Sequence, residues 1–142
     1  MEIVKTHVGA YGIILKDNKI ALIRKARGGY KGKLDLPGGG IEHTETPEET
    51  LKRELREEIE AEVTFYELFD VTSTNIKWQM KEDVWEDLHH IGILYKAEIN
   101  TDKLKSDADG LDSEGASWYE IDSLNDEELS PFASYCLKKI RK

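Results

Sequence analysis

The sequence has little cysteine and no long apolar run. Cys136 is the only cysteine among 142 residues, which excludes an internal disulfide and a zinc site built from several cysteines. The longest apolar stretches, such as residues 13–15, are far too short to cross a bilayer, and residues 1–5 lack the apolar segment of a signal peptide. These absences predict a soluble, cytoplasmic protein. Cys136 lies in a helical pattern near the C-terminus, which predicts a buried structural thiol.

Acidic residues outnumber basic ones. The chain has 20 Lys and Arg against 29 Asp and Glu, a formal net charge of −9. Such a charge repels phosphate, so a general nucleic-acid or anionic-membrane binder is disfavoured. A protein of this charge that handles phosphates needs a local basic patch, a metal ion or both. The length and the 39% of hydrophobic residues suit one core, and therefore a single domain over residues 1–142.

Turn and capping patterns predict both strands and helices. Asp17-Asn18 tolerates positive φ and separates two apolar runs, which indicates a hairpin. Thr46, Pro47 and Glu49 have the positions of an N-cap, a first-turn proline and a capping-box glutamate, and apolar residues every four positions carry this helix to about residue 59 or 60. Further elements are expected as strands at 63–71, 76–80, 89–99 and 118–121, a loop at 100–115 and a last helix after Ser130-Pro131. The mixture predicts a central sheet with helices packed on it.

Three glutamates cluster on one side of the first predicted helix. Glu54, Glu57 and Glu58 lie next to its apolar stripe. Like charges three or four residues apart cost a helix about 0.2–0.5 kcal/mol per pair, so the cluster is unfavourable unless a cation lies among the carboxylates. Carboxylate oxygens suit Mg²⁺ or Mn²⁺. A solvated charged face is the alternative interpretation of the same residues.

The spacing around the glycine run is more specific than the cluster. Gly39 is followed after five residues by Glu45, after seven more by Arg53-Glu54-Leu55, and after one more by Glu57-Glu58. Seven such positions match by accident with a probability on the order of 10⁻⁴ or less. The pattern resembles the signature of the Nudix hydrolase family. It departs from that signature at Glu60, where the family has a glycine that ends the helix in a left-handed conformation.

The resemblance implies a fold and an activity. The fold is α+β, a Nudix-type α/β/α sandwich with a central mixed sheet. The activity is Mg²⁺-dependent hydrolysis of a pyrophosphate bond in a nucleoside di- or triphosphate derivative by a metal-activated water, with Mn²⁺ as a substitute. The substrate is a small nucleotide; no membrane is involved, nucleic acid is disfavoured, and a homodimer is compatible because many relatives are dimers. Two alternatives stay open: a nucleotide-sensing module without turnover, and a hydrolase acting on the 5′ triphosphate end of RNA.

Residue roles also follow from the resemblance. The implied metal ligands are Glu54, Glu57, Glu58, a backbone carbonyl near Gly38 and, from the late loop, Asp112. Arg53 would orient a glutamate through charge-assisted bonds, and Glu45 would support the turn into the helix. The general base is open between Glu54, Glu57, Asp112 and Glu114. Substrate binding is expected from Arg27, Lys31 and Lys33 of the basic loop, with Gly39 and Glu114; solvated loop lysines are the alternative.

Aromatic residues and histidines give weaker indications. Tyr30, Trp78, Trp85 and Tyr95 are candidates for stacking on a nucleobase, with core packing as the alternative. Strand alternation places one residue of His89-His90 inward. Pro131 is followed by Phe132, whereas family members that read 8-oxoguanine have an asparagine there. The sequence therefore does not predict which nucleotide is the substrate.

Overall fold

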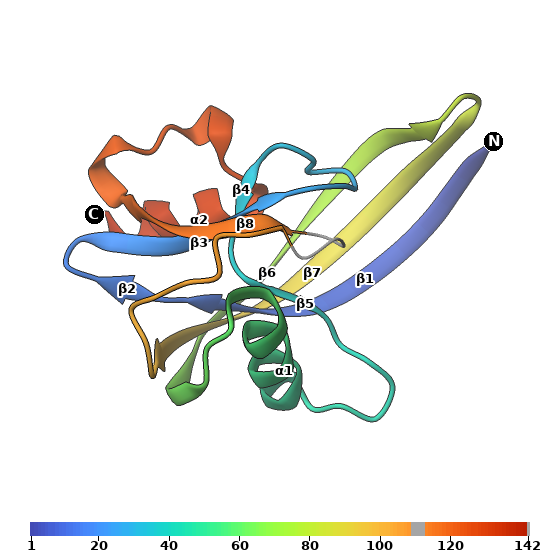
Figure 1. Cartoon of the computed structure of the whole chain (residues 1–142). Helices are drawn as coiled ribbons and strands as arrows, with labels where there is room; N and C mark the ends of the chain where they lie inside the picture. Colours follow the sequence, from blue (N-terminus) through green and yellow to red (C-terminus); the bar gives the residue numbers. More distant parts are fainter. Residues whose placement is uncertain (109–112, 142) are drawn as a thin grey trace.

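The computed structural model describes residues 1–108 and 113–141, and it places two helices on opposite sides of two sheets (Figure 1). One sheet has the order β5-β1-β7-β6. Here β1 (Glu2–Ile13) runs parallel to β7 (Val84–Ile99), while β5 (Gly38–Gly40) and β6 (Val63–Lys81) are antiparallel to their neighbours. In the antiparallel second sheet, β3 (Lys19–Lys25) pairs with β2 (Leu15–Lys16), β4 (Leu34–Asp35) and β8 (Ser113–Glu120). The predicted α+β sandwich with a mixed sheet is confirmed.

Helix α1 (Pro47–Ile59) begins and ends as its sequence predicts. The backbone N–H of Glu49 donates to the Thr46 hydroxyl at 3.1 Å, and the Glu49 carboxylate accepts from the Thr46 N–H at 2.8 Å. These bonds satisfy two donors that a helix start leaves unpaired. At the other end Glu60 has φ 56°, the left-handed conformation that glycine adopts without strain.

Two apolar clusters hold the sheets and helices together. Leu51, Leu55 and Ile59 of α1 pack on one side, against alanine and isoleucine residues of β1 and β3. On the other side, α2 (Pro131–Ile140) contributes Phe132 and Cys136, among others. Two short 3₁₀ turns, η1 (Ile121–Ser123) and η2 (Asp126–Glu128), lead into α2. Burial raises the pKa of the Cys136 thiol to about 12, as expected for a structural cysteine.

Three strands differ from their predicted limits, among them β7, which begins at Val84 and not at residue 89. Strand β6 runs unbroken through residues 72–75, where a gap was expected, and β8 begins at Ser113, inside the expected loop. Both segments are polar, but main-chain pairing to β7 and β3 does not require apolar side chains. Among the described residues, no helix is long and apolar enough to cross a membrane.

Candidate active site

The glycines of β5 let the backbone approach α1 closely. A Cβ atom at Gly39 would lie 2.6 Å from the carboxylate of Glu54, and one at Gly38 would lie 2.2 Å from the Ala10 carbonyl oxygen. Gly38 also has φ 146°, outside the range of most L-residues. The main chain of β5 therefore lies directly against the carboxylates of the helix.

Arg53 connects the start of α1 to β5. Its Nε and Nη2 donate to the two carboxylate oxygens of Glu45 at 2.6 and 2.9 Å, Nη1 donates to Glu54 at 3.0 Å, and Nη2 also donates to the Gly40 carbonyl at 3.2 Å. The guanidinium lowers the pKa of Glu45 to about 2. The planar fork of arginine fits such bidentate contacts. The structure thus brings Arg53, Glu45 and Glu54 together.

The three predicted ligand glutamates have different environments. Glu58 is 4% exposed and accepts the Gly38 N–H at 2.8 Å; burial, with a smaller contribution from the negative charge of Glu54, raises its pKa. Glu54 is largely covered, with 17% of its side chain exposed. Glu57 is exposed, and its carboxylate lies 3.5 Å from Arg53. The cluster inferred from helical spacing is therefore split between the interior and the surface.

The donors present suit a hard divalent cation. Within residues 1–108 and 113–141, no three His, Cys, Asp or Glu side chains are grouped closely enough to hold a metal ion. The buried carboxyl of Glu58 is nevertheless close enough to Glu54 for the two charges to repel each other. A cation between them would favour the ionised form of both. Asp112, the remaining predicted ligand, lies outside the described residues.

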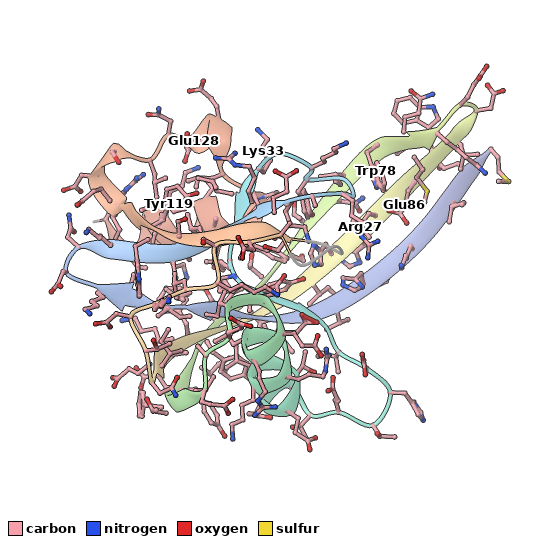
Figure 2. The ribbon with its side chains drawn as sticks, in the orientation of Figure 1. Arg27, Lys33, Trp78, Glu86, Tyr119 and Glu128 are labelled. Atoms are coloured by element: carbon pink, nitrogen blue, oxygen red, sulfur yellow. The ribbon has the colours of Figure 1, made fainter. Side chains whose placement is uncertain are left out.

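A cleft of about 790 Å³ opens beside β5. It lies among β1, β6, β7 and the loop between β3 and β4, and Figure 2 shows its residues Arg27, Trp78 and Glu86 next to the β6–β7 hairpin. Its wall is basic in an acidic protein: the cationic side chains are Lys5, Lys25, Arg27 and Lys31, and the carboxylic ones are Asp35 and Glu86. Such a wall can attract phosphate despite the net charge of the chain.

Two predicted binding residues lie elsewhere. The Lys33 ammonium donates to the Glu127 carbonyl, on the side of the loop that faces η2 and away from Trp78 (Figure 2). Glu114 is exposed on β8. Of the predicted binding residues, Arg27, Lys31 and Gly39 line the cleft. Lys33 and Glu114 are not among the described residues that line it. The sequence could not show that Arg27 faces the cleft and Lys33 does not, because side chains of one loop can point to different sides.

The floor of the cleft holds a histidine between two tyrosines. The Tyr11 hydroxyl lies 2.7 Å from Nε2 of His90, and the Tyr30 hydroxyl lies 3.1 Å from Nδ1. Burial lowers the pKa of His90 to about 3, so the ring is neutral at neutral pH and has one donor and one acceptor for the two hydroxyls. His89 is exposed, as strand alternation predicts for the neighbour of an inward residue.

Sequence reasoning missed Asp35 and Glu86, two buried carboxyl groups in the cleft. Asp35 accepts from the Ser130 hydroxyl at 2.6 Å and the Leu36 N–H at 2.8 Å, and burial raises its pKa. Glu86 accepts the indole N–H of Trp78 at 2.7 Å. For Asp35 the available signal was a charged residue between two leucines; Glu86 is followed directly by another acidic residue and had no such signal.

Only two of the four candidate aromatic residues reach the cleft. Tyr30 and Trp78 line it. Trp85 is 45% exposed on the opposite face of β7, and Tyr95 packs in the cluster under α1. The expectation of base stacking therefore narrows to Tyr30 and Trp78.

A profile of the NUDIX domain family matches residues 5–140. Because this match spans nearly the whole sequence, the chain belongs to the NUDIX domain family. The glycine run, Arg53 and the glutamates of α1 all lie within the matched region.

Individual proteins resemble the chain to different extents. It is 25% identical to the 8-oxo-dGTP diphosphatase of Escherichia coli strain K12 over 135 residues, covering 94% of this chain and 95% of that protein. It is 51% identical to the ADP-ribose pyrophosphatase of Methanocaldococcus jannaschii over 51 residues, or 36% of this chain and 30% of the relative's length. The crystal structure of a MutT NUDIX hydrolase from Burkholderia pseudomallei has a TM-score of 0.77 at 23% identity, covering 96% and 98% of the two chains, and shows the shared fold.

Proposed function

We propose that this protein is a Mg²⁺-dependent pyrophosphohydrolase of nucleoside di- or triphosphate derivatives, with Mn²⁺ able to replace Mg²⁺. The observation that carries the proposal is the junction at Gly38–Gly40: these residues form part of the cationic cleft, and Gly39 also lies against the carboxylate of Glu54. A diphosphate bound in the cleft would have its bridging bond next to the acidic side of α1. Membership of the family and the names of the relatives agree with this chemistry.

The residues of the cleft and those of α1 would have different roles in the reaction. Arg27 and Lys31 would bind the phosphates, and Trp78 and Tyr30 would stack on the base. Glu54, Glu57 and Glu58, with a backbone carbonyl near Gly38, would hold the divalent ion, which neutralises phosphate charge and lowers the pKa of the attacking water. Arg53 would keep Glu45 and Glu54 in place, and Glu54 or Glu57 would accept the proton of that water.

The test is release of phosphate or pyrophosphate from a nucleotide panel, with Mg²⁺ and with EDTA. The panel contains canonical and oxidised dNTPs, ADP-ribose, diadenosine polyphosphates, nucleotide sugars and a 5′-triphosphorylated oligonucleotide. Glu57→Gln should lower kcat about 10²–10⁴-fold with an unchanged Tm, because Glu57 is exposed. Glu67→Gln, an exposed carboxylate of β6, is the matched control.

The outcomes separate the alternatives. Near-normal turnover in Glu57→Gln removes that residue from the mechanism. Nucleotide binding without turnover under any divalent metal favours a sensing module, and preference for the oligonucleotide favours action on RNA ends. The cytoplasmic location predicted from the sequence stays a prediction.

A further inference from the structure

One carboxylate of the cleft has only part of its hydrogen-bonding capacity used. Glu86 of β7 is 7% exposed and lines the cleft. Its Oε1 accepts the indole N–H of Trp78 at 2.7 Å. In the part of the chain that the structure describes, this is the one hydrogen bond of the Glu86 side chain, which makes no ion pair there. A covered carboxylate needs further donors, because burying its charge costs free energy.

The second oxygen of Glu86 is open to the cleft. Among the described residues, no fully covered side-chain oxygen or nitrogen lacks a hydrogen-bond partner. Because Oε2 of Glu86 has no such partner, it has accessible surface, and the open space beside Glu86 is the cleft. A molecule in the cleft can therefore donate to Oε2, and Oε1 keeps a second lone pair for another donor.

Trp78 joins this acceptor to a flat aromatic surface. Figure 2 shows Trp78 and Glu86 together on the β6–β7 hairpin. The loop after β3 also passes close to the indole, since a Cβ atom at Gly29 would lie 3.1 Å from Cδ1 of Trp78. The ring is thus fixed by the carboxylate at one side and by the loop at another. A base that stacks on Trp78 would have its edge near Glu86.

Glu86 lies at the end of the cleft remote from β5. Along β1, Gly39 pairs with Ala10, whereas Glu86 pairs with Ile3, seven residues away. In a nucleotide the sugar is joined directly to the phosphates, and the base is more distant. With the phosphates near Gly39, the base is therefore the part that reaches Glu86. It is also a part that a carboxylate does not repel, unlike the phosphates.

We propose that Glu86 selects guanine, by accepting the N1–H and one N–H of the 2-amino group with its two carboxylate oxygens. The inference rests on the proposed binding of a nucleotide in this cleft. A carboxylate offers two adjacent acceptors, and guanine is the common base with two adjacent N–H donors on one edge. This edge is remote from C8, so the contact does not distinguish guanine from 8-oxoguanine.

The other common bases do not match two adjacent acceptors. Adenine and cytosine have a bare ring nitrogen beside the amino group, and the N3–H of uracil or thymine lies between two carbonyls. In each case a lone pair of the base would face the second carboxylate oxygen, which is unfavourable for a covered charge. Glu86 therefore acts against these bases as well as in favour of guanine.

The test measures binding of nucleoside 5′-monophosphates to the full chain by isothermal titration calorimetry with Mg²⁺ present. Monophosphates have no pyrophosphate bond, so the result does not depend on whether the protein hydrolyses nucleotides. The wild type should bind guanosine monophosphate (GMP) about 10-fold more tightly than inosine monophosphate (IMP), which lacks the 2-amino group. The adenosine, cytidine and uridine monophosphates should also bind more weakly than GMP.

Glu86→Gln tests the contact itself, because its amide oxygen can still accept the Trp78 N–H. Replacing the other oxygen by an NH₂ group should weaken GMP binding about 10–100-fold and reduce the preference for GMP over IMP to about one. A purely structural role of Glu86 would weaken both ligands equally and leave the preference unchanged. Glu98→Gln, the same change at an exposed position of β7 outside the cleft, should bind GMP as the wild type does.

The two ribose hydroxyls are the other pair of adjacent donors in a nucleotide, and 2′-deoxy-GMP separates them from the base. Selection of guanine predicts equal binding of GMP and 2′-deoxy-GMP. Loss of binding in the deoxy form, with equal binding of GMP and IMP, overturns the proposal in favour of the sugar. A preference for GMP over IMP that persists in Glu86→Gln, tighter binding of another base, or no binding of any monophosphate by the wild type also overturns it. In the last case, turnover in the phosphate-release assay would still support the proposed hydrolase.

Discussion

The two sides of the cleft are assembled in different ways. The acidic side comes from one stretch of chain, residues 38–58, in which β5 leads through a capped turn into α1. The basic and aromatic side comes from β1, β6, β7 and the loop after β3, whose residues are up to 85 positions apart, from Lys5 to His90. Local sequence therefore determines the first side almost alone, while the second depends on strand pairing elsewhere. Substitutions on the two sides should affect different properties, and five experiments test this difference.

The largest effect is expected at His90, on the non-local side. His90→Ala removes the partner of two covered hydroxyls, Tyr11 and Tyr30, and leaves a cavity, so the free energy of unfolding should fall by about 3 kcal/mol. Urea unfolding measures this change. The neighbouring His89→Ala, at an exposed position, should stay within about 0.5 kcal/mol of wild type. Equal losses in both variants would show that the two hydroxyls do not depend on His90.

On the local side, Arg53→Lys should reduce activity more than stability. Lysine cannot contact both oxygens of Glu45 while also reaching Glu54, so kcat/KM should fall about 10–100-fold. Arg56→Lys is the matched control, because Arg56 makes the same bidentate contact to Glu62 on an exposed part of the helix. A similar loss of activity in both proteins would mean that the fork of Arg53 has no specific role.

The neutral His90 predicts a pH dependence of stability. Its pKa is about 3 in the folded protein and about 6.5 in the unfolded chain. Between about pH 6.5 and pH 3 the unfolded chain therefore binds a proton at this histidine that the folded protein does not. As the pH falls through this range, His90 lowers the free energy of unfolding by up to about 1.4 kcal/mol for each pH unit. The free energy of unfolding measured from about pH 7 to pH 5 should decrease more steeply in wild type than in His90→Asn. Parallel curves would show that His90 titrates normally.

A smaller effect is expected at Arg27 in the cationic wall. Arg27→Ala should raise KM roughly five-fold, equivalent to about 1 kcal/mol, with little change in kcat, because an exposed charge contributes to binding more than to chemistry. Lys33→Ala removes a cation of the same loop that faces away from the cleft, and its KM should not change. The reverse order of effects would place the phosphates on the other side of the loop.

The smallest effect concerns the end of α1. Glu60→Gly should relieve the left-handed conformation at φ 56° and stabilise the protein by about 1 kcal/mol, raising Tm by roughly 2–4 °C. Glu60→Ala keeps the strain and should give no such gain. An increase in Tm with alanine as well would point to the charge of Glu60 rather than to its backbone.

The contrast between the two sides also explains which features could be predicted from the sequence. The capping box of Thr46, the helix limits and the contacts of Arg53 follow from residues within a few turns of one another. Tyr11, Asp35 and His90 meet only because β1, β4 and β7 are arranged by long-range pairing. No local pattern contains that information, and so Lys33 was grouped with Arg27, and Asp35 was missed.

The parallel pairing of β1 with β7 has a consequence for biosynthesis. Each residue of β1 pairs with one 83 positions later, from Glu2 with Trp85 to Ile13 with Lys96. Contacts between such distant segments form slowly, because a long loop must close before they stabilise anything. On the ribosome, β1 emerges well before its partner strand, with Ile3 and Val4 exposed to other nascent chains. The exposed first half of β1 is thus a segment that needs protection from other chains during translation.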